Sequence, residues 1–574
     1  MRQKTSKSLL LRFEKYLFAL FVLLVLFLAL CFRFYKLSEI PRGLNWDEVS
    51  YAYNAYSLKE TGKDEWGVSW PPFLKAFGDY KPALLSYLQI ISFWFFGLTT
   101  FAVRFPTSLL GMTSIIALGV FVFSKTKDKW LSLAMMFLLT ISPWHVHYSR
   151  IAMDPIVGFS FLMIGLAFFV QKKWLFKTLG MILLLVSMYT YNAERLLLPV
   201  FSGLYLSFLF LKNFLKKKPF KTFLVKEMWV VVFFGLSAIV FAYLTFFNSA
   251  GSRAISVLAI DKVKITENVN EIYFRSSVSG LPILRILNNK LVVIGNNFAK
   301  GYLLHFSSGF LFFDDNLSPR HAFSKYGNLL LIFIPFFIAG AVKKIRRPDD
   351  FSIFMISWLL ISPLAAALTT DIPHSGRTLQ MVVPIVYFVA VGVFYLIQLT
   401  KVSLIKKLTI TFTLSVLLFN TALYWRDYLI FFPEESGLAF QNNIKQLANF
   451  IGDSITKNPE QVVYVINAPT DPAIFLAWYL QIDPNSWQKA DDSHRKIGKI
   501  LIKDVENENA ICYLKEPNSM IITANNIISR QIVEPNSYVY SEDRFAPPVK
   551  SFDVYITEEL IMPNWLVIRE RCVD

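Results

Sequence analysis

The chain has 574 residues, of which 54% are hydrophobic, and it carries a formal net charge of +17 at pH 7. A soluble globular domain has no interior large enough for so much apolar surface, so the composition excludes an ordinary soluble protein and favours a lipid bilayer as the solvent. The lysines and arginines stand in short clusters between apolar runs, a pattern that reflects membrane topology and requires no nucleic-acid partner.

Eleven apolar stretches are expected to form transmembrane helices, because a spanning helix needs roughly 17–25 mostly apolar residues. In chain order they cover about 12–32, 103–124, 129–142, 155–171, 174–190, 196–213, 228–247, 328–345, 351–369, 378–399 and 405–424. The first stretch has no small-residue cleavage site, so we interpret it as a retained span or signal anchor.

The basic clusters between these stretches are expected on the cytoplasmic side, since Lys and Arg accumulate in cytoplasmic loops. The intervening segments are then extracytoplasmic, namely 33–102, 143–154, 191–195, 248–327, 370–377 and the tail after about 425. A further apolar run, 82–97, would break this alternation if it crossed the membrane, so we expect a juxtamembrane or re-entrant helix there. The alternative is that it spans and a weaker stretch elsewhere does not.

Acidic residues stand at helix starts in the first two outer loops. Asp47 and Glu48 open a helical pattern, and Asp154 precedes Pro155 at the start of a span. Carboxylates are favoured at such positions by the helix dipole and the free N–H groups, so each could be an ordinary capping residue.

Single arginines recur in the short outer loops, which otherwise lack positive charge. These loops hold Arg150, Arg195 with the nearby Tyr191, and Arg377 with His374. Ionisable groups at this depth usually face a water-filled cavity and mark a functional site.

The sequence indicates a reaction that uses a donor presented by the membrane. The longest cytoplasmic loop, about 213–227, has no room for a nucleotide-binding domain, and no convincing Walker or G-x-G-x-x-G pattern occurs. A polyprenyl-phosphate sugar meets the need, because Arg and Lys suit its phosphate and a carboxylate can accept the proton of an acceptor hydroxyl.

Four of the histidines are expected to have roles other than metal binding. His145 and His147 stand two residues apart in a loop without cysteine, which favours interfacial polar packing over a metal site, and His305 and His321 are expected to be structural or substrate-shaping. No cofactor is expected, and a divalent metal is possible but not supported by the motifs.

After about residue 436 the composition becomes that of a soluble domain. Helical and strand patterns alternate there, which predicts a small α/β domain whose role could be acceptor recognition, assembly or stabilisation. It holds Cys512 and Cys572, which could pair if the domain is extracytoplasmic.

The outer loops resemble those of the GT-C glycosyltransferases, in particular bacterial relatives of the dolichyl-phosphate-mannose protein mannosyltransferases and of the lipid A aminoarabinose transferase. The resemblance covers about 35–430, and the Asp47-Glu48 pair is its most diagnostic feature. Other similar segments are Trp66-Gly67, 78–82, 102–106, 142–154, Tyr191 to Pro199, Arg253 and 305–327.

The resemblance implies an inverting, single-displacement sugar transfer. Asp47 would be the general base, supported by Glu48, and Asp154 would orient the acceptor or the base. Lys81, Arg195 and Arg377 would hold the leaving phosphate. The second loop has Asp154 but no Asp-Glu pair, so the metal-dependent oligosaccharyltransferase branch is a poor match, and without a β-trefoil pattern a protein acceptor is in doubt.

The predicted architecture is an all-α polytopic membrane domain over 1–435 with an extracytoplasmic α/β domain over 436–574. The predicted function is sugar transfer from a polyprenyl-phosphate donor to a lipid, glycan or protein acceptor at the outer face of the cell membrane. Arg150, Tyr191 and His374 are further candidate substrate contacts. The alternatives are a transporter of lipid-linked sugars, for which internal repeats are missing, and a non-catalytic scaffold.

Overall fold

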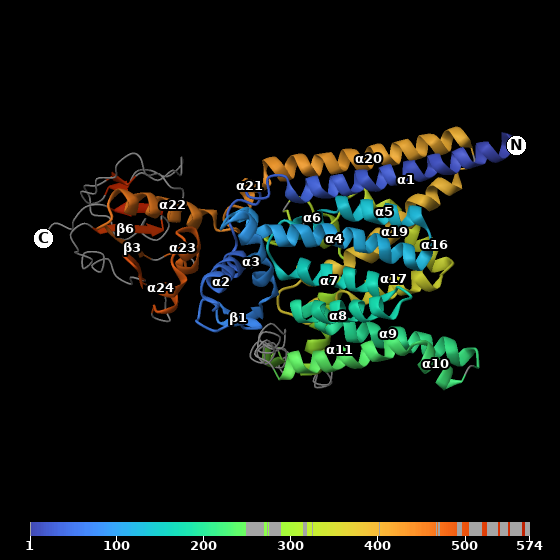
Figure 1. Ribbon diagram of the computed structural model, residues 1–574, viewed down its shortest axis with the longest axis horizontal. Helices are drawn as coiled ribbons and strands as arrows, with labels where there is room; N and C mark the ends of the chain where they lie inside the picture. The colour runs from blue at the N-terminus through green and yellow to red at the C-terminus, as the bar shows by residue number, and fades with distance from the viewer. Residues whose placement is uncertain are drawn as a thin grey trace. The chain divides into compact units, whose positions relative to one another are not determined.

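The computed structural model is mostly helical, with small sheets (Figure 1). It describes residues 2–217, 219–247, 269–271, 274, 289–313, 318–323, 325–400, 402–466, 468, 471–490, 496–503, 519–524, 538–539, 549–550 and 565–568. The chain forms two compact units. The first comprises Met1–Ile40, Pro72–Leu85 and Arg104–Phe432, and the second Pro41–Pro71, Ser86–Val103 and Pro433–Asp574. Arg253, Cys512 and Cys572 lie outside the described residues.

The first unit consists mainly of helices, of which the long apolar ones run along a common direction (Figure 1). They are α1 (Arg2–Phe34), α4 (Thr100–Thr126), α5 (Lys129–Ile141), α6 (Pro143–Ser149), α7 (Asp154–Phe169), α8 (Trp174–Thr190), α9 (Asn192–Leu215), α10 (Phe220–Lys226), α11 (Met228–Phe246), α15 (Lys290–Leu304), α16 (Phe333–Arg346), α17 (Asp350–Ile361), α18 (Leu364–Ala367), α19 (Val382–Leu399) and α20 (Ser403–Ile430). Two short turns of other helix types, η1 (Gly309–Phe313) and η2 (Gly376–Met381), complete the set. Each of the eleven apolar stretches predicted from the sequence coincides with helix over most of its length.

Seven helical stretches among the described residues are long and apolar enough to cross a membrane. An eighth span results if α6 and α7, which meet at an angle of 110°, are counted together, while α3 (Leu84–Phe96), α5 and α8 are shorter apolar helices. The prediction of a multi-pass α-helical membrane protein is therefore confirmed. The eleven predicted crossings include α5 and α8, which are shorter than the length taken here for a membrane span.

A β-hairpin in the first unit carries one of the predicted site residues. Strands β1 (Phe73–Ala76) and β2 (Asp79–Pro82) are antiparallel, with Leu74 opposite Lys81. The turn residues Phe77 and Gly78 both have positive φ, 51° and 77°. Two positive φ values are the feature of the tight turns whose twist matches that of paired strands.

The second unit contains the predicted α/β fold. Its helices are α2 (Trp46–Thr61), most of α3, α21 (Phe432–Glu435), α22 (Asn442–Lys457), α23 (Ala473–Tyr479) and α24 (Pro484–Gln488). Its sheet has the order β4-β5-β3-β6-β9, formed by β4 (Lys496–Ile497), β5 (Ile500–Lys503), β3 (Val462–Ile466), β6 (Ser519–Ala524) and β9 (Trp565–Ile568). The central strand β3 is parallel to both neighbours and the edge pairs are antiparallel. A separate pair is formed by β7 (Tyr538–Val539) and β8 (Val549–Lys550).

Part of the first predicted outer loop packs with the C-terminal residues. The Tyr53 hydroxyl donates to the carbonyl of Ile482 at 3.1 Å, and the Gln488 amide donates to Ser57 Oγ at 2.9 Å. The Phe93 and Trp478 rings stack at 5.6 Å between centroids. Helix α2, which begins with the Asp47-Glu48 pair, is thus held by the α/β domain within the second unit.

Candidate functional site

The turn between α18 and η2 is anchored to the end of α15 by two histidines. The backbone N–H of His374 donates to Nε2 of His305 at 3.1 Å, and Nδ1 of His305 donates to the carbonyl of Gly301 at 2.8 Å. Burial lowers the pKa of His305 to about 4, so this imidazole is neutral at pH 7 and can accept the hydrogen bond. The turn that carries His374 is therefore held by a specific tautomer of His305.

Arg377 lies at the start of η2 with its guanidinium fixed by the same turn. Its Nη1 donates to Thr369 Oγ1 at 2.7 Å and to the carbonyl of Asp371 at 3.2 Å. Its backbone N–H lies 3.3 Å from Nδ1 of His374. A hydroxyl and a carbonyl thus hold one nitrogen of the guanidinium, so the turn fixes the orientation of this side chain.

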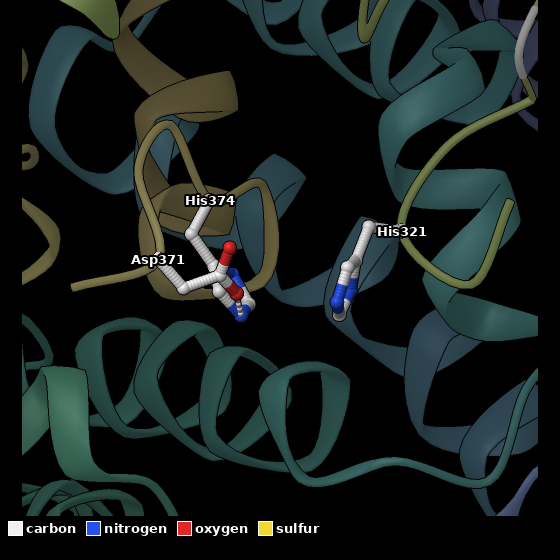
Figure 2. A group of neighbouring side chains, drawn as sticks. All are labelled: His321, Asp371 and His374. Carbon is white, nitrogen blue, oxygen red and sulfur yellow. Dashed lines mark ion pairs between the residues drawn. The ribbon is translucent and has the colours of Figure 1, made fainter. Parts of the chain in front are cut away.

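His321, Asp371 and His374 form a cluster in which each residue offers one ligand atom, all within 4.8 Å of one another (Figure 2). His374 Nε2 lies 3.6 Å from Asp371 Oδ2, and the rings of His321 and His374 are 4.5 Å apart. The side chain of His374 is 10% exposed and that of Asp371 is 66% exposed. The cluster joins a residue of segment 318–323 to the turn that carries Arg377.

Tyr191 and Asp154 belong to the electrostatic neighbourhood of Arg377. Burial raises the pKa of Tyr191 well above its usual value, the positive charge of Arg377 opposes this, and Tyr148, Glu194 and Asp154 add to the increase in the pKa. Tyr191 ends α8 and precedes α9, and Asp154 lies in the first turn of α7. The N-cap of α7 is Met153, so Asp154 is not the capping residue.

Arg195 and the hairpin of Lys81 meet at Tyr189. The Arg195 Nε and Nη2 atoms donate to the carbonyls of Met188 at 3.0 Å and Tyr189 at 3.2 Å, at the end of α8. The Tyr189 hydroxyl accepts from the backbone N–H of Ala83 at 3.2 Å, and its ring contacts Phe73 of the hairpin. The Lys81 side chain is 2% exposed. Two predicted phosphate ligands therefore lie on elements that share one tyrosine.

The Arg150 side chain is hydrogen-bonded to the backbone around the end of α1. Its Nη atoms donate to the carbonyls of Phe32, Tyr35, Lys36 and Ile40 at 2.9 to 3.3 Å. These carbonyls lie at the end of α1 and just beyond it, where a helix leaves carbonyl groups without helical partners. The prediction of Arg150 as a substrate contact remains untested, and its donors stabilise the end of α1.

Asp47 and Glu48 occupy the first turn of α2 in the second unit. The Asn45 side chain accepts from the backbone N–H groups of Asp47 at 3.0 Å and Glu48 at 3.1 Å. The fully buried Glu48 carboxylate accepts from the backbone N–H of Asn45 at 3.0 Å, which completes a capping box. Asp47 is half-buried. The capping alternative therefore describes Glu48.

Two histidines have the packing roles expected of them. His145 lies between Arg33 Nη2 at 2.7 Å and Ser114 Oγ at 3.0 Å, and His147 Nε2 contacts the carbonyl of Arg320 at 3.0 Å. The residue that sequence reasoning missed is Asp371, whose spacing of three residues before His374 was the available signal.

The chain is similar to one glycosyltransferase family over its N-terminal part. Residues 23–188 match the family described as dolichyl-phosphate-mannose-protein mannosyltransferase. The predicted resemblance is thereby confirmed for this segment, which contains Asp47, Lys81 and Asp154. Comparison with curated proteins gave no match.

Two solved structures are similar to most of the chain. The archaeal oligosaccharyltransferase AglB from Archaeoglobus fulgidus, in complex with an inhibitory peptide and a dolichol-phosphate, has 14% identity and a TM-score of 0.49 over 89% of this chain and 70% of AglB. ArnT from Cupriavidus metallidurans, bound to undecaprenyl phosphate, has 12% identity and a TM-score of 0.48 over 88% of this chain and 93% of ArnT.

Proposed function

We propose that the protein is a glycosyltransferase that moves a sugar from a polyprenyl-phosphate donor to a hydroxyl group of a lipid, glycan or protein acceptor. The observation that carries the proposal is the family match over residues 23–188. This segment includes an acid proposed as the base, Asp47, and two further polar residues proposed for the site, Lys81 and Asp154.

The proposed reaction is a single displacement with inversion at the anomeric carbon. The acceptor oxygen forms a bond to this carbon while the bond to the phosphate oxygen breaks, and the phosphate leaves with the bonding electrons. The hydroxyl proton passes to the carboxylate of Asp47, and Asp154 orients the acceptor or the base. Positioned general bases typically contribute about 10²–10⁴-fold to the rate.

The leaving phosphate requires positive charge, because its negative charge grows in the transition state. Lys81, Arg195 and Arg377 are proposed to supply it. The bonds of Arg195 and Arg377 to carbonyl and hydroxyl oxygens support this role, since they fix the orientation of the two guanidinium groups. Tyr191 is held neutral by burial and is proposed, with His374, as a hydrogen-bonding contact to the substrate.

The proposed location of the reaction is the outer face of the cell membrane. The support is the distribution of Lys and Arg. Their clusters are expected on the cytoplasmic side, which leaves the loops that hold Asp47, Asp154 and Arg377 on the extracytoplasmic side. The α/β domain is proposed to lie on the same side, and its contacts with α2 within the second unit support a role in positioning that helix.

The test is transfer of radiolabelled sugar from synthetic polyprenyl-phosphate sugars to membranes of the native host. Wild type, Asp47→Asn and Glu39→Gln would be purified and compared. Glu39→Gln is the control, because Glu39 is a 66% exposed acid in the same predicted outer loop, 33–102. We expect transfer by wild type and the control and a loss of about 10²–10⁴-fold in Asp47→Asn. Transfer by Asp47→Asn equal to that of wild type would show that another residue is the base. No transfer by folded wild type with any donor would favour a transporter or a scaffold.

A further inference from the structure

The proposed sugar transfer uses His374 as a substrate contact but gives no role to His321 and Asp371, which form a cluster with it. We propose that it is a binding site for a divalent transition-metal cation, with Zn²⁺ as the preferred ion. Two imidazoles and one carboxylate form a ligand set that suits zinc, and three protein ligands leave a fourth position for water or another oxygen ligand.

The distances in the cluster fit a metal of this size. Zinc binds nitrogen and oxygen ligands at about 2.0–2.2 Å, so two ligand atoms of a tetrahedral site lie about 3.3–3.6 Å apart. His374 Nε2 and Asp371 Oδ2 lie 3.6 Å apart, and all three ligand atoms lie within 4.8 Å of one another. Figure 2 shows the side chains of His321 and His374 approaching from two different segments, with Asp371 beside His374. Small side-chain rotations would bring the third atom into range.

The hydrogen bonds around His321 select the tautomer that a metal ligand needs. The Ser375 hydroxyl donates to the carbonyl of His321 at 2.9 Å, so its only proton is used. The Tyr148 hydroxyl therefore donates to Ser375 Oγ at 2.9 Å, and its oxygen accepts from Nδ1 of His321 at 3.1 Å. With the proton on Nδ1, the lone pair of His321 is on Nε2. A ligand histidine whose other N–H is bonded to a fixed acceptor is the usual arrangement in metal sites.

His374 is held in place by its backbone as well as by its ring. Its backbone N–H donates to Nε2 of His305, and its Nδ1 accepts the backbone N–H of Arg377 at 3.3 Å, which places the ring proton on Nε2. Metal binding at Nε2 would break this long bond to Arg377. A cation bound at Nε2 requires the ring proton on Nδ1, so the neutral imidazole of His374 changes tautomer on binding and releases no proton. Asp371 is 66% exposed, which leaves an approach for the ion.

The consequence of metal binding would be a cross-link between segment 318–323 and the turn that carries Arg377. Metal binding can be measured without any sugar donor. A failure of this proposal is therefore distinguishable from a failure of the proposed transferase function.

The experiment measures metal binding by the full chain in detergent, purified with a tag that contains no histidine and stripped with a chelator. Zn²⁺ content would be determined by mass spectrometry after dialysis, and Co²⁺ would be titrated while its visible d–d absorption is recorded. Wild type, His321→Gln and Asp371→Asn would be compared with two controls, Glu39→Gln and Asp350→Asn. The latter changes an exposed acid of α17, and the apparent melting temperature of each variant would be recorded with and without Zn²⁺.

We expect about one Zn²⁺ per chain in wild type and the controls, with the Co²⁺ spectrum of a four-coordinate site and a melting temperature raised by Zn²⁺. His321→Gln and Asp371→Asn should weaken binding by about 100-fold or more, and Tyr148→Phe by about 10–100-fold, because the tyrosine orients a ligand. The proposal is overturned if folded wild type binds neither ion. It is also overturned if both ligand variants bind as tightly as wild type, or if the controls lose the metal to the same extent.

Discussion

His305 and His374 are joined by a hydrogen bond from the backbone N–H of His374 to Nε2 of His305, 3.1 Å long and spanning 69 residues of sequence. The bond requires a neutral imidazole, because a protonated Nε2 cannot accept. It links the end of α15 to the turn that positions Arg377, so the protonation state of a buried side chain controls how that turn is held.

The stability of the protein should therefore fall in acid partly through His305. Its folded-state pKa is about 4 and its ordinary value is 6.5, so between these values the unfolded chain binds the proton more readily. Stability contributed by the neutral imidazole is complete above about pH 6.5 and is lost as the pH falls towards 4, by at most about 3 kcal/mol. The apparent melting temperature of wild type and His305→Gln, measured between pH 7 and pH 4, checks this. We expect His305→Gln to have a lower melting temperature than wild type at pH 7 and a smaller decrease in melting temperature towards pH 4. Parallel curves of melting temperature against pH would contradict the role assigned to His305.

Glu48 should matter for stability rather than for chemistry. Glu48→Ala removes the acceptor of the buried Asn45 N–H and should cost about 1–3 kcal/mol, whereas Glu48→Gln keeps an acceptor oxygen at the same position and should cost less than about 1 kcal/mol. Chemical denaturation and the transfer assay, normalised to folded protein, measure the two effects. If Glu48→Gln is stable but loses transfer as severely as Asp47→Asn, then Glu48 takes part in the reaction.

Arg377 should contribute to use of the donor through its charge. Arg377→Gln removes a charge-assisted interaction worth about 1.5–3 kcal/mol, which corresponds to a decrease of roughly 10- to 150-fold in kcat/KM for the polyprenyl-phosphate sugar. Arg377→Lys keeps the charge but not the planar geometry, so its kcat/KM should lie between those of wild type and Arg377→Gln. Arg346→Gln, at the exposed end of α16, is the matched control and should behave as wild type. An unchanged kcat/KM in Arg377→Gln would remove this residue from the phosphate site.

Arg150 should be needed for folding of the helix bundle. Arg150→Gln leaves several carbonyls around the end of α1 without their donor and should cost about 3 kcal/mol or more, and Arg150→Lys should not restore the loss because one ammonium cannot serve four separated carbonyls. Yield of folded protein and the apparent melting temperature measure this effect. A variant that folds like wild type but requires more donor for half-maximal rate would instead support the substrate contact predicted from the sequence.

Features that depend on local sequence were predictable for this protein. Apolar runs predict helices because each run depends only on the surroundings of its own segment. The alternation of helical and strand patterns after residue 436 predicted the α/β fold for the same reason. The capping box of Asn45 and Glu48 is also local, since its two residues stand three apart, and the spacing could have identified the role of Glu48 from the sequence.

The tertiary structure decided which polar residues act together, because those contacts join segments that are distant in the chain. Arg150 and Arg377 look alike as single arginines in short outer loops, yet Arg150 donates to carbonyls more than a hundred positions earlier and Arg377 is fixed within its own turn. His321 comes into range of Asp371 and His374 only when segment 318–323 packs near the turn between α18 and η2. Sequence alone determined that this is a multi-pass membrane protein with acids and arginines at helix ends. The assignment of these residues to structure or to chemistry depended on packing, since only folding determines which donor reaches which acceptor.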